Sequence, residues 1–432
     1  MIVVRNLDNK NKKHFFLKKR VDTASEIDDA EDENDIREVV VEKNNGFNTL
    51  EVIIMIFVSI FFGIVVGCVL SSSKTFGTEV SDEAQEIIST YNSIIDNYYG
   101  EVDEKELLDS AVSGMISILN DPYSLFMDSN NTENFSQTID GSFVGIGVVV
   151  EWSSDGFCIT KILDNSPAEK AKLTVGDYII RIDDKDIKEL SLTEVSNMLK
   201  GKVGSKKSLT IKRNGENKKV EIELETVEIQ SVFSKELDGN IGYISIETFA
   251  SNTSEQFVAE LAKLEDKKIK SLIIDVRDNP GGRLGQVNDI LDLFFDKKTV
   301  LYQIQTKEKN EKVYAKKTDK REYPIVVLVN YGSASASEIL AVSFQENYNN
   351  VTVVGGVTYG KGTIQKAVKL SSGSSLKYTT QKWLTPSGKW INEKGVIPDE
   401  VIDQSLDYNI NPTDDNDVQL QKAIELLKNK SR

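Results

Sequence analysis

The residues of this chain best suited to nucleophilic chemistry lie between positions 330 and 370. Three serines alternate with alanines at 333–337, directly after the apolar, β-branched run at 324–329. Such a run is typical of a buried strand, so the serines are expected at a turn from a strand into a helix. Unpaired N–H groups at a helix N-terminus favour developing negative charge, and the alanines leave room for a substrate backbone. This segment is therefore a candidate site for attack by a serine hydroxyl.

A lysine and a glutamine follow at a spacing that brings them to one side of the chain. Gly360 and Gly362 flank Lys361 at the start of an extended run. Lys361, Thr363 and Gln365 recur with period two, so their side chains are expected to point to one face. That face offers an amine and an amide to the serine segment.

The composition limits which base could activate a serine. His14 is the only histidine of the chain, and its two cysteines are Cys68 and Cys158. No Ser-His-Asp triad, Cys-His pair or histidine-based zinc site can therefore be built in the main domain. A desolvated, neutral lysine can take a serine proton, so a Ser-Lys pair is the mechanism that remains. Such a pair needs no metal and no organic cofactor.

Two glycines after another predicted strand could stabilise an oxyanion. The sequence Asn-Pro-Gly-Gly at 279–282 follows an apolar run at 271–276. Gly281 and Gly282 can present backbone N–H groups there, with the N–H of Ala336 as a second donor. The same tetrapeptide is strong turn chemistry, so a plain turn is the alternative.

The elements that must position these residues alternate between strand and helix. Strands at 241–246, 271–276 and 324–329 with intervening helical patterns predict an α/β core. Residues 141–228 have the texture of short strands and turns, whereas 82–120 follow helical spacing. A short amphipathic helix is expected at 417–427 and should pack on the protein.

The N-terminal region differs from the rest in composition. Residues 1–48 hold a basic block followed by an acidic one and few aromatic residues, which predicts a disordered tail. Residues 52–70 are continuously apolar except for Ser59, Gly63 and Gly67. In a helix this run reaches about 28 Å, enough for a bilayer core. The expectation is a single transmembrane helix within 49–73 rather than a cleaved signal peptide.

Length, charge and cysteine content argue against nucleic-acid-binding and disulfide-rich proteins. With 432 residues and 39% hydrophobic content, the chain can form two or three domains with real cores. A net charge of −16 argues against nucleic acid as a partner. Two cysteines in so long a chain exclude a disulfide framework.

Six motifs together resemble the carboxy-terminal processing peptidases, S41-family tail-specific serine proteases that combine a PDZ domain with a Ser-Lys core. They are Asp-Pro-Tyr-Ser at 121–124, Asp-Val-Arg-Asp-Asn-Pro-Gly-Gly at 275–282, Ser-Ala-Ser-Ala-Ser-Glu at 333–338, Thr-Tyr-Gly-Lys-Gly-Thr-Ile-Gln at 358–365, Leu-Thr-Pro-Ser-Gly at 384–388 and Lys-Gly-Val-Ile-Pro-Asp at 394–399. The resemblance extends from about Asp82 to the C-terminus. It has two departures, because Gly356 stands where the family usually has glutamate and the bend at 347–350 is one residue longer.

The resemblance implies roles and domains. Ser335 would be the nucleophile, Lys361 the general base and Gln365 the residue that orients the lysine. The fold would be a ClpP/crotonase-like α/β catalytic core with an inserted β-rich PDZ domain, an N-terminal helical segment and the single transmembrane helix. The implied domains after the span are the helical segment at 74–138, the PDZ domain at 139–229, the peptidase core at 230–404 and a C-terminal helical tail at 405–432.

A further part of the resemblance concerns peptide binding. The predicted carboxylate-binding loop and the start of the next strand comprise Val144, Gly145, Ile146, Gly147 and Val148. Backbone N–H groups around the glycines can hold a terminal carboxylate, while the peptide adds a strand beside an apolar groove and the helix at 192–200. Glycines at a bulge in an ordinary β-domain are the alternative.

The implied function is that of a serine endopeptidase that recognises protein or peptide substrates with free apolar C-termini. The implied location is the bacterial cell membrane, single-pass, with the N-terminus cytoplasmic and the PDZ and peptidase domains extracytoplasmic. The oligomeric state stays open, with a homo-oligomer as one alternative. A catalytically idle PDZ scaffold is the rival function. A penicillin-binding enzyme is a second rival, but its Ser-x-x-Lys match at 71–74 abuts the span and no Lys-Thr-Gly follows.

Overall fold

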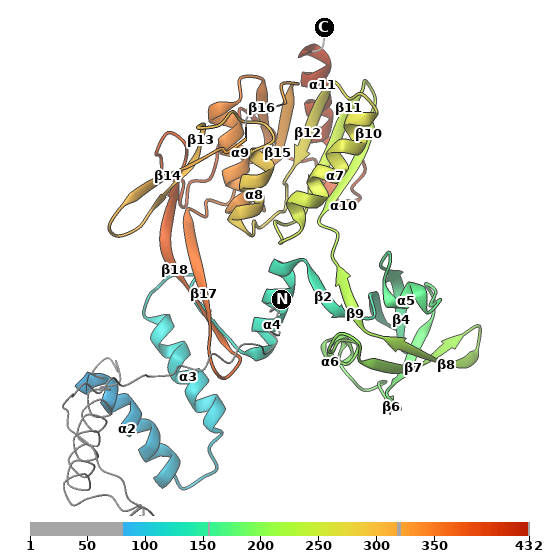
Figure 1. Ribbon diagram of the computed structural model, residues 1–432, viewed down its shortest axis with the longest axis vertical. Helices are drawn as coiled ribbons and strands as arrows, with labels where there is room; N and C mark the ends of the chain where they lie inside the picture. Colours follow the sequence, from blue (N-terminus) through green and yellow to red (C-terminus); the bar gives the residue numbers. More distant parts are fainter. Residues whose placement is uncertain (1–80, 154–155, 318–320, 431–432) are drawn as a thin grey trace, which may run out of the picture. The chain divides into compact units, whose positions relative to one another are not determined.

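The computed structural model describes residues 81–153, 156–317 and 321–430 (Figure 1). The chain divides into two compact units, 1–90 and 91–432, and each is described by itself. The described part of the first unit is the beginning of helix α2 (Asp82–Asn97), which continues into the second. The predicted disordered tail at 1–48 lies outside the described residues.

A mixed, mainly parallel sheet forms the centre of the C-terminal region (Figure 1). Its strands lie in the order β10 (Val232–Leu237), β11 (Ile241–Ile246), β12 (Ser271–Asp275), β15 (Ile325–Val329), β16 (Val351–Gly355) and β19 (Glu400–Val401). β10 is antiparallel to β11, and every other pair is parallel. β11, β12 and β15 coincide with the predicted strands, so the α/β core follows the sequence pattern.

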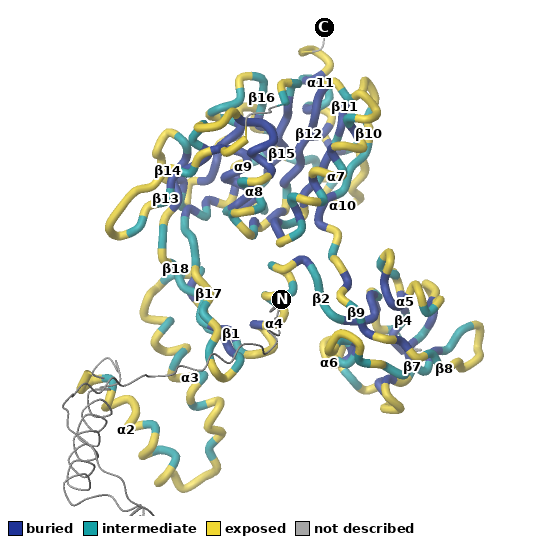
Figure 2. Tube along the Cα trace, viewed as in Figure 1, coloured by how far each residue is buried: buried dark blue, intermediate teal, exposed yellow. Residues whose placement is uncertain are grey.

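Helices cover both faces of this sheet, which explains its uninterrupted apolar strands. One face packs against α7 (Thr253–Asp266), α8 (Leu284–Leu291) and α9 (Ala336–Asn347), and the other against α11 (Val418–Lys430). Every residue of β12 and β15 is buried (Figure 2). Successive residues serve opposite faces, since Val327 joins the cluster with α7 to α9 and Val326 the cluster with α11. The predicted C-terminal amphipathic helix therefore does pack on the protein.

A second, antiparallel sheet carries the segment that follows Lys361. Its order is β1 (Leu125–Met127), β18 (Ser375–Leu384), β13 (Val300–Gln305) and β14 (Asn310–Tyr314), with β17 (Thr363–Lys369) paired to β18. In the β17–β18 pair Gln365 lies opposite Thr379, and Ala367 lies opposite Lys377. The hairpin thus brings side chains from both strands to one face.

Residues 142–228 form a small β-domain with its own core. Its strands are β2 (Ser142–Gly145), β3 (Val148–Ser153), β4 (Gly156–Ile162), β5 (Tyr178–Ile182), β6 (Lys185–Asp186), β7 (Lys206–Arg213), β8 (Glu216–Glu223) and β9 (Glu225–Glu228), and its helices are α5 (Pro167–Lys170) and α6 (Leu192–Met198). β3 is an edge strand, because the main sheet runs β3-β4-β5-β7-β8. This agrees with the short strands and turns expected from the sequence.

The remaining helices include three short segments besides α2. They are α3 (Glu104–Ser117), α4 (Ser129–Asp140) and α10 (Leu406–Ile410). Aspartates cap two of them, since Asp103 accepts a hydrogen bond from the N–H of Glu106 and Asp128 one from the N–H of Asn131. The helical region predicted from 82 onward is thus present.

The fold-class prediction needs one correction, which concerns its single transmembrane helix. Among the helices of the described residues, none is both long and apolar enough to cross a membrane. The longest of them, α2, has 16 residues, or about 24 Å at the helical rise, and begins with two acidic residues. The stretch predicted to span, 49–73, lies outside the described residues. The supported fold class is therefore the α/β core, the β-domain and the helices that precede it.

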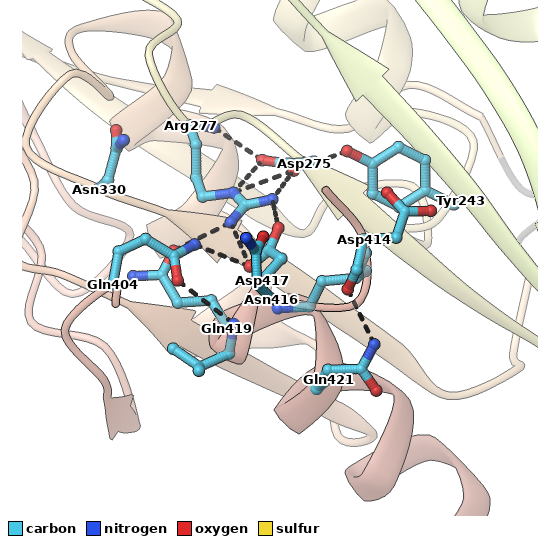
Figure 3. Close-up of polar contacts among 12 residues, drawn as sticks. Tyr243, Asp275, Arg277, Asn330, Gln404, Asp414, Asn416, Asp417, Gln419 and Gln421 are labelled. Atoms are coloured by element: carbon cyan, nitrogen blue, oxygen red, sulfur yellow. Dashed lines mark hydrogen bonds and ion pairs between the residues drawn. The ribbon is translucent and has the colours of Figure 1, made fainter. Parts of the chain in front are cut away.

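A buried ion cluster attaches the C-terminal helix to the end of β12 (Figure 3). The guanidinium of Arg277 contacts the carboxylates of Asp275 at 2.6 Å and Asp417 at 2.8 Å. The three side chains are 4 to 9% exposed. Asp417 also accepts hydrogen bonds from Gln404 and from the N–H of Leu420, so it both caps α11 and pairs the arginine.

We expect Asp417→Ala to lower the free energy of unfolding by about 3 kcal/mol, because it deprives a buried guanidinium of one partner. The control is Asp414→Ala, which removes an ion pair between Lys235 and a half-exposed aspartate and should cost less than about 1 kcal/mol. Urea unfolding followed by tryptophan fluorescence, to which the buried Trp383 contributes, measures both. Equal losses for the two variants would contradict this assignment.

Candidate active site

The three serines at 333–337 differ in exposure, and the middle one is partly exposed. The hydroxyl of Ser333 donates to the carbonyl of Val276 at 2.7 Å, and that of Ser337 donates to the carbonyl of Asn279 at 2.8 Å. Both side chains are fully buried. Ser335 is only partly buried and lines a cleft together with Lys361. The two outer serines therefore have structural partners, and the middle one is available for chemistry.

Ser335 has an unusual backbone conformation at the start of α9. Its φ is +56°, a region that residues with a side chain seldom occupy. Its N–H donates to the carboxylate of Glu338 at 2.8 Å, one turn into the helix. This contact belongs to a capping box and fixes the turn at which α9 begins.

Glu338 is a fully buried carboxylate that joins the serine turn to the lysine segment. Besides the N–H of Ser335, it accepts hydrogen bonds from the Thr358 hydroxyl at 2.6 Å and from the N–H groups of Gly360 at 2.7 Å and Lys361 at 2.9 Å. Burial raises the pKa of Glu338, against the opposing effect of these bonds. One side chain thus positions the backbones of both Ser335 and Lys361.

Lys361 lies in surroundings that favour its neutral form. Burial, with a smaller contribution from the ammonium of Lys377, lowers the pKa of Lys361 from its ordinary 10.5 to about 8. The amine lies 5.0 Å from the centre of the Tyr123 ring, and the carbonyl of Lys361 accepts a hydrogen bond from the indole of Trp383 at 2.7 Å. An amine with such a pKa can act as a base near neutral pH.

Gln365 lines the same cleft as Ser335 and Lys361. Its amide nitrogen donates to the hydroxyls of Thr363 at 2.8 Å and Thr379 at 3.2 Å. Among the described residues, the structure gives no hydrogen bond between Gln365 and Lys361. The glutamine is therefore held by two threonines of the β17–β18 hairpin.

The glycine loop after β12 lies against the serine turn. Gly281 has a φ of +99°, and a Cβ atom at this position would lie 2.7 Å from the carbonyl oxygen of Ala334 and 3.0 Å from the nitrogen of Ala336. Only glycine fits here, both for its backbone conformation and for this close approach. The N–H of Gly281 itself donates to the side chain of Asn279 at 2.8 Å.

The backbone donors left at this point are those of Gly282 and Ala336. Within the described part of the chain, neither N–H has a hydrogen-bond partner, and Ala336 is the first residue of α9, where such N–H groups are normally unpaired. Of the three predicted oxyanion residues, Gly281 thus supplies the close packing, whereas Gly282 and Ala336 have N–H groups to offer.

The cleft has a volume of about 750 Å³. It contains Ser335, Lys361, Gln365 and both glycines of the loop, while Phe135 and Ile139 of α4 contribute to its apolar part. Within the described residues, no group of three or more His, Cys, Asp or Glu is arranged to hold a metal ion. The space is large enough for a segment of extended peptide.

The two departures from the family pattern do not disturb the strands around the site. α9 ends at Asn347, and β16 begins at Val351 in regular parallel register with β15. Gly356 donates its N–H to the carbonyl of Val329 at 3.1 Å, directly after the register ends. The predicted bend at 347–350 thus falls between the end of α9 and the start of β16, and the extra residue expected there stays a prediction.

In the β-domain, the predicted carboxylate-binding loop is a tight structure. Gly147 has a φ of +80°, and a Cβ atom there would lie 2.3 Å from the Cβ of Ser166. The carbonyl of Ile146 accepts a hydrogen bond from the N–H of Ala168, and the carbonyl of Val144 accepts one from Gly201. Gly145 forms a bridge with Lys200, two residues after the end of α6, and Val148 begins the edge strand β3. The five predicted residues thus lie between α6 and the sheet edge.

Sequence reasoning missed two residues of the site. Glu338 stood inside the Ser-Ala-Ser-Ala-Ser-Glu motif, and a glutamate three residues into a helix after serine is a recognisable capping pattern. Its contacts with Gly360 and Lys361 gave no signal, because they join segments more than twenty positions apart. Lys377 also lines the cleft, and only the pairing of β17 with β18 brings it there.

Comparisons with known proteins agree with this architecture. Three family models match in sequence order: "Activating protease CtpB N-terminal domain" over residues 68–131, "PDZ domain" over 144–224 and "Peptidase family S41" over 240–402. The carboxy-terminal processing protease CtpB of Bacillus subtilis (strain 168) is 40% identical over 338 residues, which cover 77% of this chain and 70% of that protein. CtpA of the same organism is 39% identical over 310 residues, covering 71% and 66%.

A solved structure of photosystem II D1 C-terminal processing protease is 25% identical, covers 75% of this chain and 94% of its own, and superposes with a TM-score of 0.43. That superposition is loose, so the assignment depends on the sequence identities. They are high and extend over most of the chain and of the relatives. The chain therefore belongs to the S41 family of carboxy-terminal processing proteases, serine peptidases that carry a PDZ domain.

Proposed function

We propose that this protease cleaves proteins near free apolar C-termini, with Ser335 as the nucleophile and Lys361 as the general base. The observation that carries the proposal is the lowered pKa of Lys361, about 8, in the cleft that also contains Ser335. At pH 7 about a tenth of such amines are neutral, against well under a thousandth for an ordinary lysine. The family membership supports the reaction, and the geometry supports the choice of residues.

The proposed reaction proceeds in two halves. The Oγ of Ser335 attacks the peptide carbonyl carbon while its proton passes to the Nζ of Lys361. The resulting oxyanion receives hydrogen bonds from the N–H groups of Gly282 and Ala336. The C–N bond then breaks, the ammonium returns the proton to the leaving amine, and an acyl-serine remains. Water, deprotonated by Lys361, releases the second product in the same way.

Gln365 is proposed to stabilise the lysine in its protonated state. Two threonine hydroxyls already accept hydrogen bonds from its amide nitrogen. The carbonyl oxygen Oε1 is therefore the atom left to accept a hydrogen bond from the ammonium once Lys361 has taken the proton. Because these two hydrogen bonds hold the amide nitrogen of Gln365, its carbonyl oxygen is left for the ammonium.

The PDZ domain is proposed to bind the substrate's terminal carboxylate at the loop 145–147. An extended peptide could add to β3, because this strand is at the edge of its sheet and packs beside α6. Such binding promotes cleavage only if the bound tail favours the active arrangement over an inactive one.

We expect Ser335→Ala to abolish cleavage of an unstructured protein with an apolar C-terminus, followed as fragments by mass spectrometry. Ser333→Ala and Ser337→Ala each lose a buried hydrogen bond, which costs about 1 kcal/mol of stability, but should retain turnover. An active Ser335→Ala variant, or a dead Ser337→Ala variant that is still folded by circular dichroism, would refute the choice of nucleophile.

The rate should also depend on pH through the lysine. Because the neutral amine is the active form, kcat/KM should rise about tenfold per pH unit below 8 and level off above it. Lys377→Met removes a neighbouring positive charge, which raises the pKa of Lys361 and moves the midpoint to higher pH, whereas Lys377→Arg keeps it. A profile that falls with rising pH, or that ignores Lys377→Met, would contradict the assignment.

The tail recognition can be tested on the substrate alone. Amidating the C-terminus, or ending it in two aspartates, should slow cleavage because the carboxylate loop and the apolar groove lose their contacts. The enzyme offers a second test, in which a bulky replacement of Gly147 should slow cleavage of every substrate without changing the reactivity of Ser335 toward a small acylating probe. Equal cleavage rates for free, amidated and acidic tails would leave the PDZ domain without this role.

A further inference from the structure

The active-site cleft is positively charged although the chain as a whole is strongly acidic. The charged residues that line it are Arg283, Lys361 and Lys377, and no aspartate or glutamate is among the described residues of its lining. The net charge of the chain is −16. A cleft lined by charges of one sign focuses the field inside it and attracts groups of the opposite sign.

Two of these three cations already have an assignment. The guanidinium of Arg283 pairs with Asp140 of α4 at 2.6 Å, and both are about half exposed. Lys361 is the proposed base and is neutral in its active form. Lys377 is the cation that has neither an ion pair with a described residue nor a step in the reaction.

Lys377 is held at the cleft by three elements. On β18 it lies opposite Ala367 of β17 on one side and Leu125 of β1 on the other. Its ammonium lies 5.1 Å from the centre of the Phe135 ring of α4, and the residue is partly buried. An aromatic face attracts a cation but leaves its hydrogen bonds unmade.

The ionisable groups around Lys377 do not neutralise it. Burial lowers the pKa of Lys377, against the attraction of Asp121, and Lys361 repels it only while Lys361 is protonated. The carboxylate of Asp121 already accepts hydrogen bonds from the Ser124 hydroxyl and the N–H of Tyr123. Glu338 is engaged in its own four hydrogen bonds behind Lys361. Among the described residues the ammonium of Lys377 has no hydrogen-bond acceptor, and it faces the cleft that also contains Ser335.

We propose that Lys377 is a specificity-determining residue that selects peptide segments with a carboxylate side chain beside the scissile bond. The inference rests on the proposed function, because it concerns the segment that the cleft holds during cleavage. A glutamate or aspartate of the substrate would give the ammonium the ion pair that it lacks. Partial burial of the ammonium beside Phe135 makes this pairing stronger than on a fully exposed surface.

The test compares peptides that differ by one charge. In an unstructured peptide with a free apolar C-terminus, glutamate and its uncharged isostere glutamine are placed in turn at each position near the scissile bond. The full chain should show a kcat/KM about fivefold higher for glutamate than for glutamine at one or two positions, as expected for one partly buried ion pair. Added salt should reduce this ratio.

Three variants test whether Lys377 causes the preference for glutamate over glutamine. Lys377→Gln should bring the glutamate-to-glutamine ratio close to one, and Lys377→Arg should keep it. Any effect of these changes on the base Lys361 acts on both peptides and cancels in the ratio. Lys366→Gln is the matched control, since Lys366 is exposed on β17 and does not line the cleft, and it should leave the ratio unchanged.

The possible results distinguish a failure of this inference from a failure of the proposed function on which it rests. A ratio near one at every position, or a preference that survives Lys377→Gln, would overturn the selection by Lys377 while the protease mechanism stands. If neither peptide were cut at any position, the proposed function would fail first and the inference with it.

Discussion

The buried carboxylate of Glu338 is the contact on which the rest of the active site depends. The proposed nucleophile begins a helix of the parallel sheet, whereas the proposed base precedes a strand of the antiparallel sheet. No single element could position both. Glu338 accepts hydrogen bonds from the backbone of each, and four donors together replace the water that the ion loses on burial. Because backbone groups are held, the two side chains keep their freedom to move protons.

A second junction joins the glycine loop to the serine turn. The loops follow β12 and β15, which are parallel neighbours, so both leave the sheet at the same edge. Asn279 connects them, since its carbonyl accepts hydrogen bonds from the N–H of Ala334 and the hydroxyl of Ser337, and its side chain accepts one from Gly281. The groups around the proposed oxyanion position are thus held by hydrogen bonds within the protein.

The sequence predicted local features such as strands, but it did not predict contacts between segments that lie far apart in the chain. Periodicity located β11, β12 and β15. The lack of a usable histidine left a Ser-Lys pair, and the family resemblance assigned the role of the base to Lys361, which stays a prediction. The contact of Glu338 with the lysine segment, the approach of Lys377 to the cleft and the pairing of Arg277 with Asp417 each join parts of the chain that no pattern links. The N–H of Gly281 was expected to face an oxyanion, but the side chain of Asn279 binds it. The transmembrane helix was inferred from hydropathy of a stretch that the structure does not describe.

The packing of α11 affects whether the chain's own C-terminal segment could serve as a substrate. The substrate ends proposed above are unstructured and apolar, so an exposed apolar segment of this chain would compete with them. Leu420, Ala423 and Leu427 are buried against the parallel sheet, and Asp417 fastens the beginning of the helix through Arg277. The apolar residues that would mark this segment as a target are used in the core instead. The packing of the C-terminal helix therefore removes these apolar side chains from the segments on which the proposed recognition could act.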